Sequence, residues 1–454
     1  MLRKQAWIRY FHELEVELLQ SADEGKVVES LKEKVDTLNK MEDSNPLKEA
    51  MAILIYDDIE KLDIDEKYKY IEPSTFEEIK QERIIANTEL TIGNYADNLI
   101  YDRIYGAWLG RCSGCLLGKP VEGWILDKIT GFLNDTQNYP INYYLSSDVS
   151  SEIIKKYDIK NEFPEYDYLC TWINTVDFMP EDDDINYSVL SLKILEKYGK
   201  NFTPDDVGEA WLNNLPIFHT FTAERIAYRN LVMGIYPPYS ASFRNPYREW
   251  IGAQIRSDFY GYISPGNPEQ AAEFAWRDAS ISHTKNGIYG AMFVAAMLAG
   301  AYTTDDPEKI VEIGLSQIPS KSRLWEKVKE VMSWKNQGLS WMEARDRIHS
   351  LYDEKSRHGY VHTISNAMVV VTSLVYGELD LEKSITIAVM CAFDTDCNGA
   401  TVGSIVGMSR GAKGLPGKWI NPLNDCVKSG VDGFGVVKIS ELATRTIQIL
   451  KRLE

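Results

Sequence analysis

The stretch IYGAWLGRCSGCLLGKPVEGW, residues 104–124, decides how this chain packs. Glycine recurs in it at every fourth position, which places the glycines on one face of an α-helix. A helix face without side chains lets a second helix approach closely. The segment GATVGSIVG, residues 399–407, repeats the spacing. Both segments therefore predict helices that are packed tightly inside a helical protein.

Helical spacing of apolar residues dominates the remaining sequence, and alternating β patterns are rare. Residues 1–100 are rich in Glu, Lys, Leu and Ile, with helix breaks near residues 43–46 and 72–75. We therefore predict an all-α protein with a helical accessory domain at residues 1–100, followed by a second, larger helical domain at residues 101–454. Long loops are expected around residues 130–170 and 234–268.

The composition restricts the partners and the location. The net charge of −18 argues against nucleic acid, because a phosphate backbone is neutralised by Lys and Arg. The first residues lack the uninterrupted apolar core of a signal peptide, and the longest apolar stretch, residues 291–302, is too short to span a bilayer. We expect a cytoplasmic protein that binds neither nucleic acid nor membrane, with its six cysteines mostly reduced.

The stretch MPEDDD, residues 179–184, comes directly before an apolar-periodic helix. Proline and acidic residues are typical of a helix start, because carboxylates favour the positive end of the helix dipole. One or two acidic residues would be enough for that role. Four consecutive carboxylates repel one another, so a hard divalent cation is the simplest partner for them.

A second acidic helix start occurs much later in the chain, in AFDTDCNG, residues 392–399. Taken alone, this pattern would be explained by helix capping. Two acidic helix starts that converge would supply enough carboxylates for two cations roughly 3.5–4 Å apart. The pair therefore indicates a metal site more strongly than either segment does.

Two further segments contain residues suited to a substrate. Ser282 and His283 stand at the start of another helix, where a histidine is as often structural as functional. Residues 237–268 combine Arg244, Arg248 and Arg256 with Trp and Tyr. This mixture suits a nucleotide, because guanidinium binds phosphate and an aromatic ring stacks on the base. A structured surface loop with arginine–acid pairs is an equally good interpretation.

In this order, these segments resemble the ADP-ribosylglycohydrolase family, which includes dinitrogenase reductase-activating glycohydrolase and the ADP-ribosyl-acceptor hydrolases. The resemblance spans about residues 100–454. The family's G-x-P-V-E turn is similar to LGKPVE at 117–122, and its T-D-D-T motif to EDDD at 181–184. Its diphosphate and ribose loop resembles IGAQIR at 251–256, its ribose-contacting histidine falls on His283, and its D-T-D-[ST] motif resembles DTDC at 394–397.

The resemblance implies an all-α orthogonal multi-helix bundle of the ADP-ribosylglycohydrolase type, here with an N-terminal helical extension. It implies hydrolysis of the glycosidic bond at C1″ of a protein- or small-molecule-linked ADP-ribosyl group, at a site with two Mg²⁺ or Mn²⁺ ions. Asp183 or Asp394 would activate the water, and Glu122 would gate the site or contact the substrate. The implied metal ligands are Asp182, Asp183, Asp394 and Asp396, with Glu181 and Cys397 beside them. The implied substrate-binding residues are Gly252, Ala253, Arg256, Ser282 and His283.

Cys115 stands where many members of the family have Asp after the glycine, and three further residues depart from the family pattern. Cys397 stands where the family has Ser or Thr, and a thiol is a poor ligand for Mg²⁺, so one ion would be weakly bound or absent. Glu181 replaces a Thr, and Asp184 adds a charge, so the set of ligands could shift by one residue.

Three functions remain open at this point. The first is hydrolysis of an ADP-ribosyl bond, and the second is hydrolysis of another N-glycoside or nucleoside derivative. The third is a non-catalytic ADP-ribose-binding or structural protein. The acidic ligands in both clusters favour the two enzymatic functions. Residues 1–100 would serve for contacts with the neighbouring domain or between the subunits of an oligomer.

Overall fold

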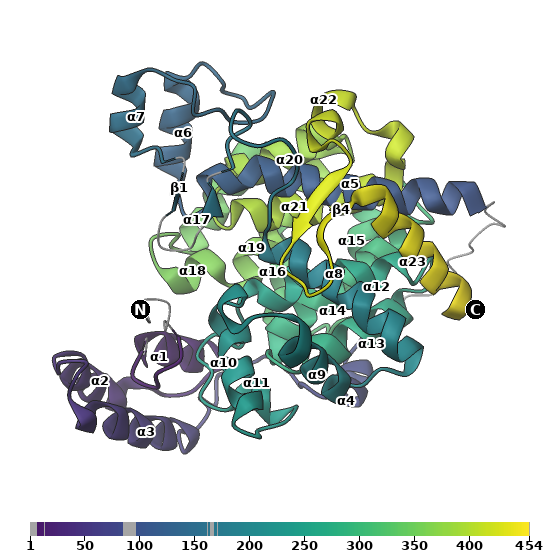
Figure 1. The fold of residues 1–454 in the computed structure, drawn as a ribbon. Coiled ribbons are helices and arrows are strands. Elements are labelled where there is room, and N and C mark those ends of the chain that lie inside the picture. The colour runs from purple at the N-terminus through teal and green to yellow at the C-terminus, as the bar shows by residue number, and fades with distance from the viewer. Residues whose placement is uncertain are drawn as a thin grey trace.

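The computed structural model describes residues 7–12, 14–84, 97–160, 162–163, 168–169 and 171–453. Helices make up nearly all of the regular structure in these ranges, so the predicted all-α class is confirmed (Figure 1). The strands among the described residues form two short antiparallel hairpins. They are β1 (Glu162–Phe163) with β2 (Tyr168–Leu169), and β3 (Cys426–Ser429) with β4 (Gly435–Lys438).

The two glycine-rich segments form α5 (Asp97–Gly118) and α21 (Thr395–Arg410), which pack against each other at the centre of the molecule (Figure 1). The helices run antiparallel with their backbones in contact: Gly106 faces Gly407, Gly110 faces Gly403 and Gly114 faces Gly399. A methyl group at Gly110 would overlap the carbonyl oxygen of Gly403. The regular glycine spacing is therefore required by helix–helix contact.

The helices around this pair are buried on most sides, as is typical of a core helix in a large protein. In α14 (Lys285–Ala301), every residue after Lys285 is buried. It packs against α13 (Pro268–Ala279), while α19 (Thr363–Gly377) packs against α16 (Arg323–Asn336) and α20 (Leu381–Met390). Of these helices, α14, α19 and α20 also pack against α21, whereas α8 (Asp183–Tyr198) packs against α5.

Shorter helices cover this core. Two expected loops contain helices, because their apolar residues find partners in the core. Within residues 130–170 these are the end of α6 (Leu126–Asp135) and α7 (Ser151–Tyr157), and within residues 234–268 they are α11 (Tyr239–Ser242), η5 (Ile251–Arg256) and α12 (Asp258–Tyr262). The covering elements are η2 (Lys119–Val121), α6 (Leu126–Asp135), α7 (Ser151–Tyr157), η3 (Gly199–Asn201), α9 (Pro204–Asn214), η4 (Ile217–His219), α10 (Thr222–Val232), α11 (Tyr239–Ser242), η5 (Ile251–Arg256), α12 (Asp258–Tyr262), α15 (Pro307–Leu315), α17 (Trp341–Leu351), α18 (Arg357–Val361), η6 (Ala412–Gly414), α22 (Gly417–Ile420), η7 (Asn421–Leu423) and α23 (Ile439–Leu453).

The N-terminal segment lies to one side of this core (Figure 1). Its first helices bury a hydrophobic cluster of their own, which includes Leu14, Val35 and Ile55. The helix breaks fall where the sequence predicts them, with Asn45 capping one helix and Thr75 preceding another. The elements of this segment are α1 (Leu14–Asp23), η1 (Glu29–Leu31), α2 (Lys32–Asn39), α3 (Pro46–Glu60) and α4 (Phe76–Gln81).

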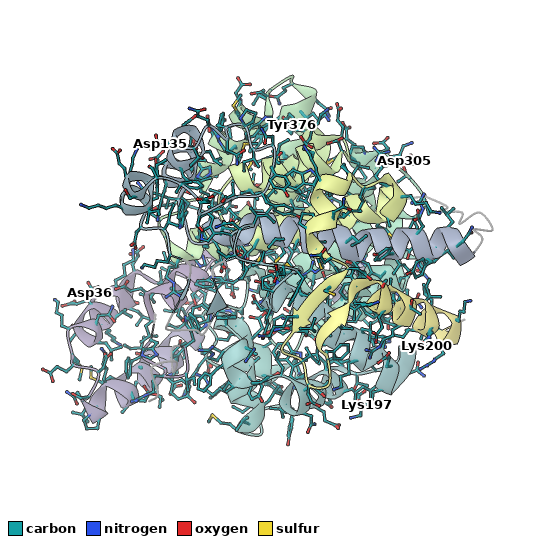
Figure 2. All side chains as sticks on the ribbon, turned by 45° about the horizontal axis from the view of Figure 1, so that its top comes forward. Asp36, Asp135, Lys197, Lys200, Asp305 and Tyr376 are labelled. Carbon is teal, nitrogen blue, oxygen red and sulfur yellow. The ribbon has the colours of Figure 1, made fainter. Side chains whose placement is uncertain are left out.

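Charged side chains cover the outside of the molecule. Figure 2 shows Asp36, Asp135 and Lys200 projecting from its periphery, where they are exposed to solvent. Among the described residues, no helix is both long and apolar enough to cross a bilayer. The described cysteines are free thiols, and all of them except Cys426 are buried.

Candidate functional site

A cavity of about 380 Å³ lies where the starts of α8 and α21 meet the end of α5. Asp182 caps α8, and its side chain accepts a hydrogen bond of 2.9 Å from the backbone N–H of Asp184. Asp394 immediately precedes α21. Because Asp182, Asp183 and Asp394 all line the cavity, the structure brings the two acidic helix starts to one place.

The backbone that leads to Asp394 is strained. Ala392 and Phe393 both have left-handed backbone angles, with φ of 59° and 58°, which cost on the order of 1–2 kcal/mol per residue. The side-chain oxygen of Asn366 accepts hydrogen bonds from the backbone N–H of Asp394 (3.2 Å) and from Asn398 (2.8 Å). These bonds hold the strained turn, which directs the Asp394 carboxylate into the cavity.

Two overlapping sets of buried side chains could hold a metal ion. Within each set, the potential ligand atoms lie within 4.8 Å of one another. Asp396 belongs to both sets. The first set is Cys115, Asp182, Asp184 and Asp396, and the second is Asp394, Asp396 and Cys397.

The ammonium group of Lys119 lies next to the first set. It pairs with Asp182, and its Nζ atom lies 3.7 Å from Asp396 Oδ2 and 3.2 Å from Glu122 Oε2. Burial acts to raise the pKa of Asp182, but the Lys119 ammonium and the hydrogen bond from the Asp184 backbone together hold this pKa below its ordinary value. Lys119 therefore neutralises one carboxylate of the cluster.

Three further carboxyl groups of the site have raised pKa values. Burial raises the pKa of Asp183 well above its ordinary value, and the charge of Asp182 adds to the effect. Burial, followed by the charge of Glu122, raises the pKa of Asp396 and brings that of Asp394 to about 7. These shifts reflect an excess of buried negative charge, which a divalent cation would neutralise.

Asp184, the additional acid of the first cluster, has a partner in the core. Arg111 Nη2 lies 3.2 Å from Asp184 Oδ1, and Arg111 Nη1 lies 2.7 Å from Asp258 Oδ2, with all three side chains fully buried. Burial would penalise each charge on its own, so the three stabilise one another. The second oxygen of Asp184, Oδ2, has no hydrogen-bond partner among the described residues.

Glu181 and Cys397 both line the cavity. Glu181 Oε1 lies 2.6 Å from His219 Nδ1 and accepts a weaker hydrogen bond from Asn186 at 3.3 Å. Burial raises the pKa of the Cys397 thiol well above its ordinary value, and the charge of Asp184 adds to this effect. A neutral thiol is a weak ligand, so the cavity has one soft position beside its carboxylates.

Of the five predicted substrate-binding residues, Gly252 lines the cavity. Ala253, Arg256, Ser282 and His283 are fully buried behind this wall. Arg256 Nη2 donates to Ser282 Oγ at 2.8 Å, and Ser282 Oγ lies 2.8 Å from His283 Nδ1. These polar side chains therefore form a hydrogen-bonded chain that supports the cavity wall.

Glu224 connects this supporting chain to the cavity. Its carboxylate lines the cavity, accepts from Arg256 Nη1 at 2.8 Å and occupies the space that a side chain at Gly252 would need. Burial raises the pKa of Glu224 to about 7, although the charge of Arg256 opposes this shift. Near neutral pH, Glu224 can donate a proton or accept one.

Arg244 and Arg248, the other arginines of the 237–268 segment, pair with acids of the N-terminal segment. Arg244 Nη2 lies 3.1 Å from Asp57, and Arg248 Nη1 lies 2.8 Å from Glu17. For these two arginines, the structure agrees with arginine–acid pairs rather than with nucleotide binding.

Several side chains that line the cavity were not predicted from the sequence. Lys119 lies within the quoted LGKPVE turn, where its charge was visible as a signal. Glu224, His219 and Tyr360 have no local pattern that marks them, because each is one polar residue in an ordinary helix or turn. Trp7 belongs to a segment for which no site was predicted.

The available ligand atoms fit a hard divalent cation. Carboxylate oxygens are the ligands that Mg²⁺ and Mn²⁺ prefer. The buried oxygens Asp184 Oδ2 and Asp396 Oδ1 have no hydrogen-bond partner among the described residues, although buried polar atoms are nearly always satisfied. The buried carboxylates could therefore hold a metal ion.

Comparison with known proteins gives the family. Residues 96–451 match the family described as ADP-ribosylglycohydrolase. No curated protein matches the chain. A solved structure described as "ADP-ribosylglycohydrolase-related protein complex" aligns with 17% sequence identity and a TM-score of 0.45, covering 79% of this chain and 100% of that one. Since the family match spans most of the sequence, this chain belongs to the ADP-ribosylglycohydrolase family, a family of glycosidic hydrolases.

Proposed function

We propose that the protein hydrolyses the glycosidic bond at C1″ of an ADP-ribosyl group that is linked to a protein or a small molecule. The observation that carries this proposal is the convergence of Asp182, Asp183 and Asp394 on one cavity, with a surplus of buried negative charge. Cleavage of a glycosidic bond passes through a positively charged, oxocarbenium-like state, which nearby carboxylates stabilise.

The residues of the chain take separate parts in this reaction. Asp183 or Asp394 orients the attacking water and accepts its proton, since both carboxylates line the cavity. Glu122, whose side chain is 48% exposed, stands at the edge of the cavity and contacts the substrate or gates its entry. Glu224 presents a carboxyl group that can exchange a proton near neutral pH on the Gly252 side.

We further propose that the site holds two Mg²⁺ or Mn²⁺ ions. Asp182, Asp183, Asp394 and Asp396 would bind them, with Glu181 and Cys397 in adjacent positions. Bound divalent ions orient the hydroxyl groups of the ribose and lower the pKa of water. The Lys119 ammonium competes with one ion for Asp182 and Asp396.

A second candidate function is hydrolysis of another N-glycoside or nucleoside derivative at the same site. It is favoured by Cys397 at a ligand position and by the His219–Glu181 contact at the cavity wall.

For the remainder of the protein, residues 1–100 are proposed as an accessory helical domain that could also make oligomer contacts, and residues 101–454 as the catalytic domain. We also propose that the protein is cytoplasmic and that nucleic acid is not among its partners.

The test is release of ADP-ribose from arginine-, serine- and acetyl-linked substrates in Mg²⁺ or in EDTA. We expect turnover of at least one linkage in Mg²⁺ and none in EDTA. Asp394→Asn should lower kcat by about 100-fold or more, because it removes a carboxylate that handles the water. Asp36→Asn, which changes an exposed carboxylate on α2, is the matched control and should keep wild-type activity.

Each outcome separates the candidate functions. Turnover of another nucleoside glycoside, with none of the ADP-ribosyl substrates, would replace the first function by the second. Tight binding of ADP-ribose without turnover of any glycoside would indicate a non-catalytic binding protein. Full activity of Asp394→Asn would remove this carboxylate from the mechanism.

A further inference from the structure

The N-terminal segment contributes a side chain to the wall of the cavity. Trp7 lines it together with Phe221 and Trp250 of the main core. The Trp7 and Phe221 rings meet edge to face, with their centroids 6.0 Å apart. The guanidinium carbons of Arg225 and Arg357 lie 4.9 Å and 5.7 Å from the Trp7 ring. These contacts restrict the indole, so Trp7 is a fixed part of the wall.

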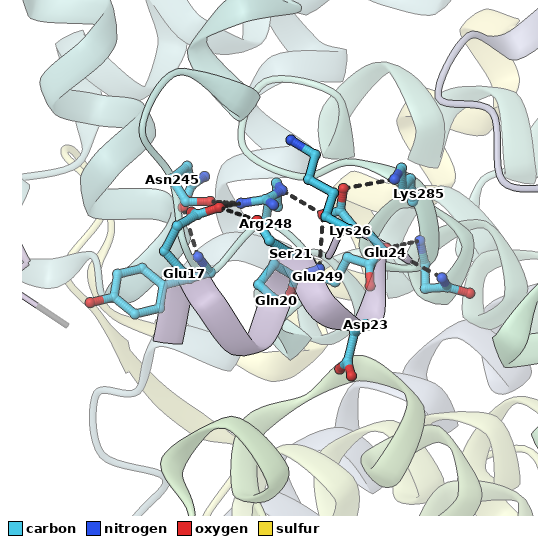
Figure 3. A network of polar contacts seen from close by, with 12 residues as sticks. Glu17, Gln20, Ser21, Asp23, Glu24, Lys26, Asn245, Arg248, Glu249 and Lys285 are labelled. Carbon is cyan, nitrogen blue, oxygen red and sulfur yellow. Dashed lines mark hydrogen bonds and ion pairs between the residues drawn. The ribbon is translucent and has the colours of Figure 1, made fainter. Parts of the chain in front are cut away.

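Buried ion pairs attach the N-terminal segment to the residues that form this wall. Arg248 pairs with Glu17 of α1 at 2.8 Å and with Glu24, directly after α1, at 2.6 Å, and Figure 3 shows both carboxylates facing this guanidinium. Lys285 Nζ lies 2.7 Å from the other oxygen of Glu24. Since Arg248 stands two residues before Trp250, these pairs fix α1 beside the aromatic wall. A buried pair of this kind is costly to break, because one charge would remain without a partner.

A second attachment is made by Asp23, on the side of α1 away from Arg248 (Figure 3). His358 Nε2 lies 2.8 Å from Asp23 Oδ2, and His362 Nε2 lies 4.0 Å from the same atom. The cavity-lining residues Tyr360 and Val361 stand between these two histidines. Asp23 therefore attaches α1 to a second stretch of the cavity wall.

The Asp23 cluster has the composition of a metal site, but its hydrogen bonds argue for a different role. Trp250 Nε1–H donates to His358 Nδ1, and the backbone N–H of Ile364 donates to His362 Nδ1, both at 3.1 Å. In a neutral imidazole whose Nδ1 accepts, Nε2 carries the proton. The Nε2–H group of His358 then points at Asp23, while His362 Nε2 lies nearer to Glu249 Oε2, at 3.6 Å, than to Asp23. A metal ion at this position would require the opposite tautomers.

From these contacts we propose that the N-terminal segment is part of the substrate site, and that Trp7 selects the substrate by packing against its planar base. This inference rests on the proposed function, because it assigns the aromatic side of the same cavity to a nucleoside-type substrate. The two acidic clusters lie on other elements of the cavity, at the starts of α8 and α21. An indole suits a nucleobase, because every base has an aromatic face on which it can pack.

The test compares Trp7→Ala, Trp7→Phe and Tyr10→Ala in the full chain. Tyr10 is the matched control, because it is also an aromatic residue of the N-terminal segment that touches the main core, through Phe243 and Arg229, but it does not line the cavity. KM and kcat are measured on the ADP-ribosyl substrate that the wild type hydrolyses, and binding of free ADP-ribose is measured by calorimetry. Thermal unfolding verifies that each variant is folded.

We expect Trp7→Ala to raise KM, and the Kd of ADP-ribose, about tenfold, with kcat within about twofold of wild type, because stacking on a base contributes to binding and not to the bond-breaking step. Trp7→Phe should recover most of the loss, and Tyr10→Ala should match wild type. An unchanged KM in folded Trp7→Ala, or an equal rise in Tyr10→Ala, would overturn the inference and leave the proposed function standing. A wild-type protein that neither binds ADP-ribose nor cleaves an ADP-ribosyl bond would overturn the proposed function, and this inference with it.

Discussion

Asp394→Asn should stabilise the metal-free protein at pH 8 while it lowers the activity. Asp394 is 6% exposed and lies among carboxylates that repel its charge. Asparagine has nearly the same shape and no charge. The substitution therefore removes the repulsion and leaves the packing of the cavity wall in place.

The size of the effect follows from the pKa. Burial, with the charge of Glu122, raises the pKa of Asp394 from 3.8 to about 7 in the folded protein. At about 1.4 kcal/mol per pKa unit, ionised Asp394 destabilises the fold by about 4 kcal/mol above pH 7. Because the pKa of Asp394 is higher in the folded state than in the unfolded state, Asp394 does not destabilise the fold below its unfolded pKa, where it is protonated in both states. The stability of the wild type then falls as the pH rises through the folded pKa. The advantage of Asn should thus shrink to about 2 kcal/mol at pH 5.

The assay is urea unfolding of the EDTA-treated wild type, Asp394→Asn and the control Asp36→Asn, at pH 8 and pH 5. Mg²⁺ is then added at pH 8. It should stabilise the wild type by binding the folded state and should have a much smaller effect on Asp394→Asn. An Asn variant that is no more stable than wild type at pH 8 without metal, or whose advantage does not depend on pH, would refute the electrostatic account of this cluster.

Two further substitutions test the packing and the charge of the site. Gly110→Ala should lower the free energy of unfolding by about 1–3 kcal/mol, because its methyl group meets the backbone of Gly403, which cannot move aside. The control is Gly208→Ala, where the neighbour is a flexible side chain, and it should lower the free energy of unfolding by less in the same denaturation assay. Equal costs would contradict the backbone-contact explanation. Lys119→Met should tighten Mg²⁺ binding about tenfold by calorimetry, because the ammonium competes for the same carboxylates, whereas the exposed control Lys200→Met should bind as wild type does. Weaker binding by Lys119→Met would mean that the lysine supports the metal site.

Much of the fold was predictable, because the relevant patterns are local. The spacing of Gly106, Gly110 and Gly114 predicted a close helix contact, and the structure places another glycine-rich helix against them. The helix breaks of the N-terminal segment also fall where predicted. The helices within residues 130–170 and 234–268 were not predicted, since the stability of short helices depends on tertiary contacts more than on their own sequence.

The candidate site was predicted less completely. The two acidic helix starts were recognised because acids, proline and an apolar period occur together in a short stretch. Lys119, Glu224 and Trp7 meet these acids in the cavity, but they come from distant parts of the chain. Their positions depend on how the helices pack, which residue spacing does not encode.

The sequence alone determined the helical class, the glycine faces and the two acidic helix starts, since each depends on a helical period or on neighbouring residues. Only the tertiary structure decided that α5 and α21 pack on each other and that Arg111 compensates the fourth acid, Asp184. It also decided that an indole from residue 7 reaches the cavity. The physical reason is that charge compensation and cavity walls are made between elements that are distant in the chain. Their partners are set by the burial of apolar surface and by the pairing of buried charges.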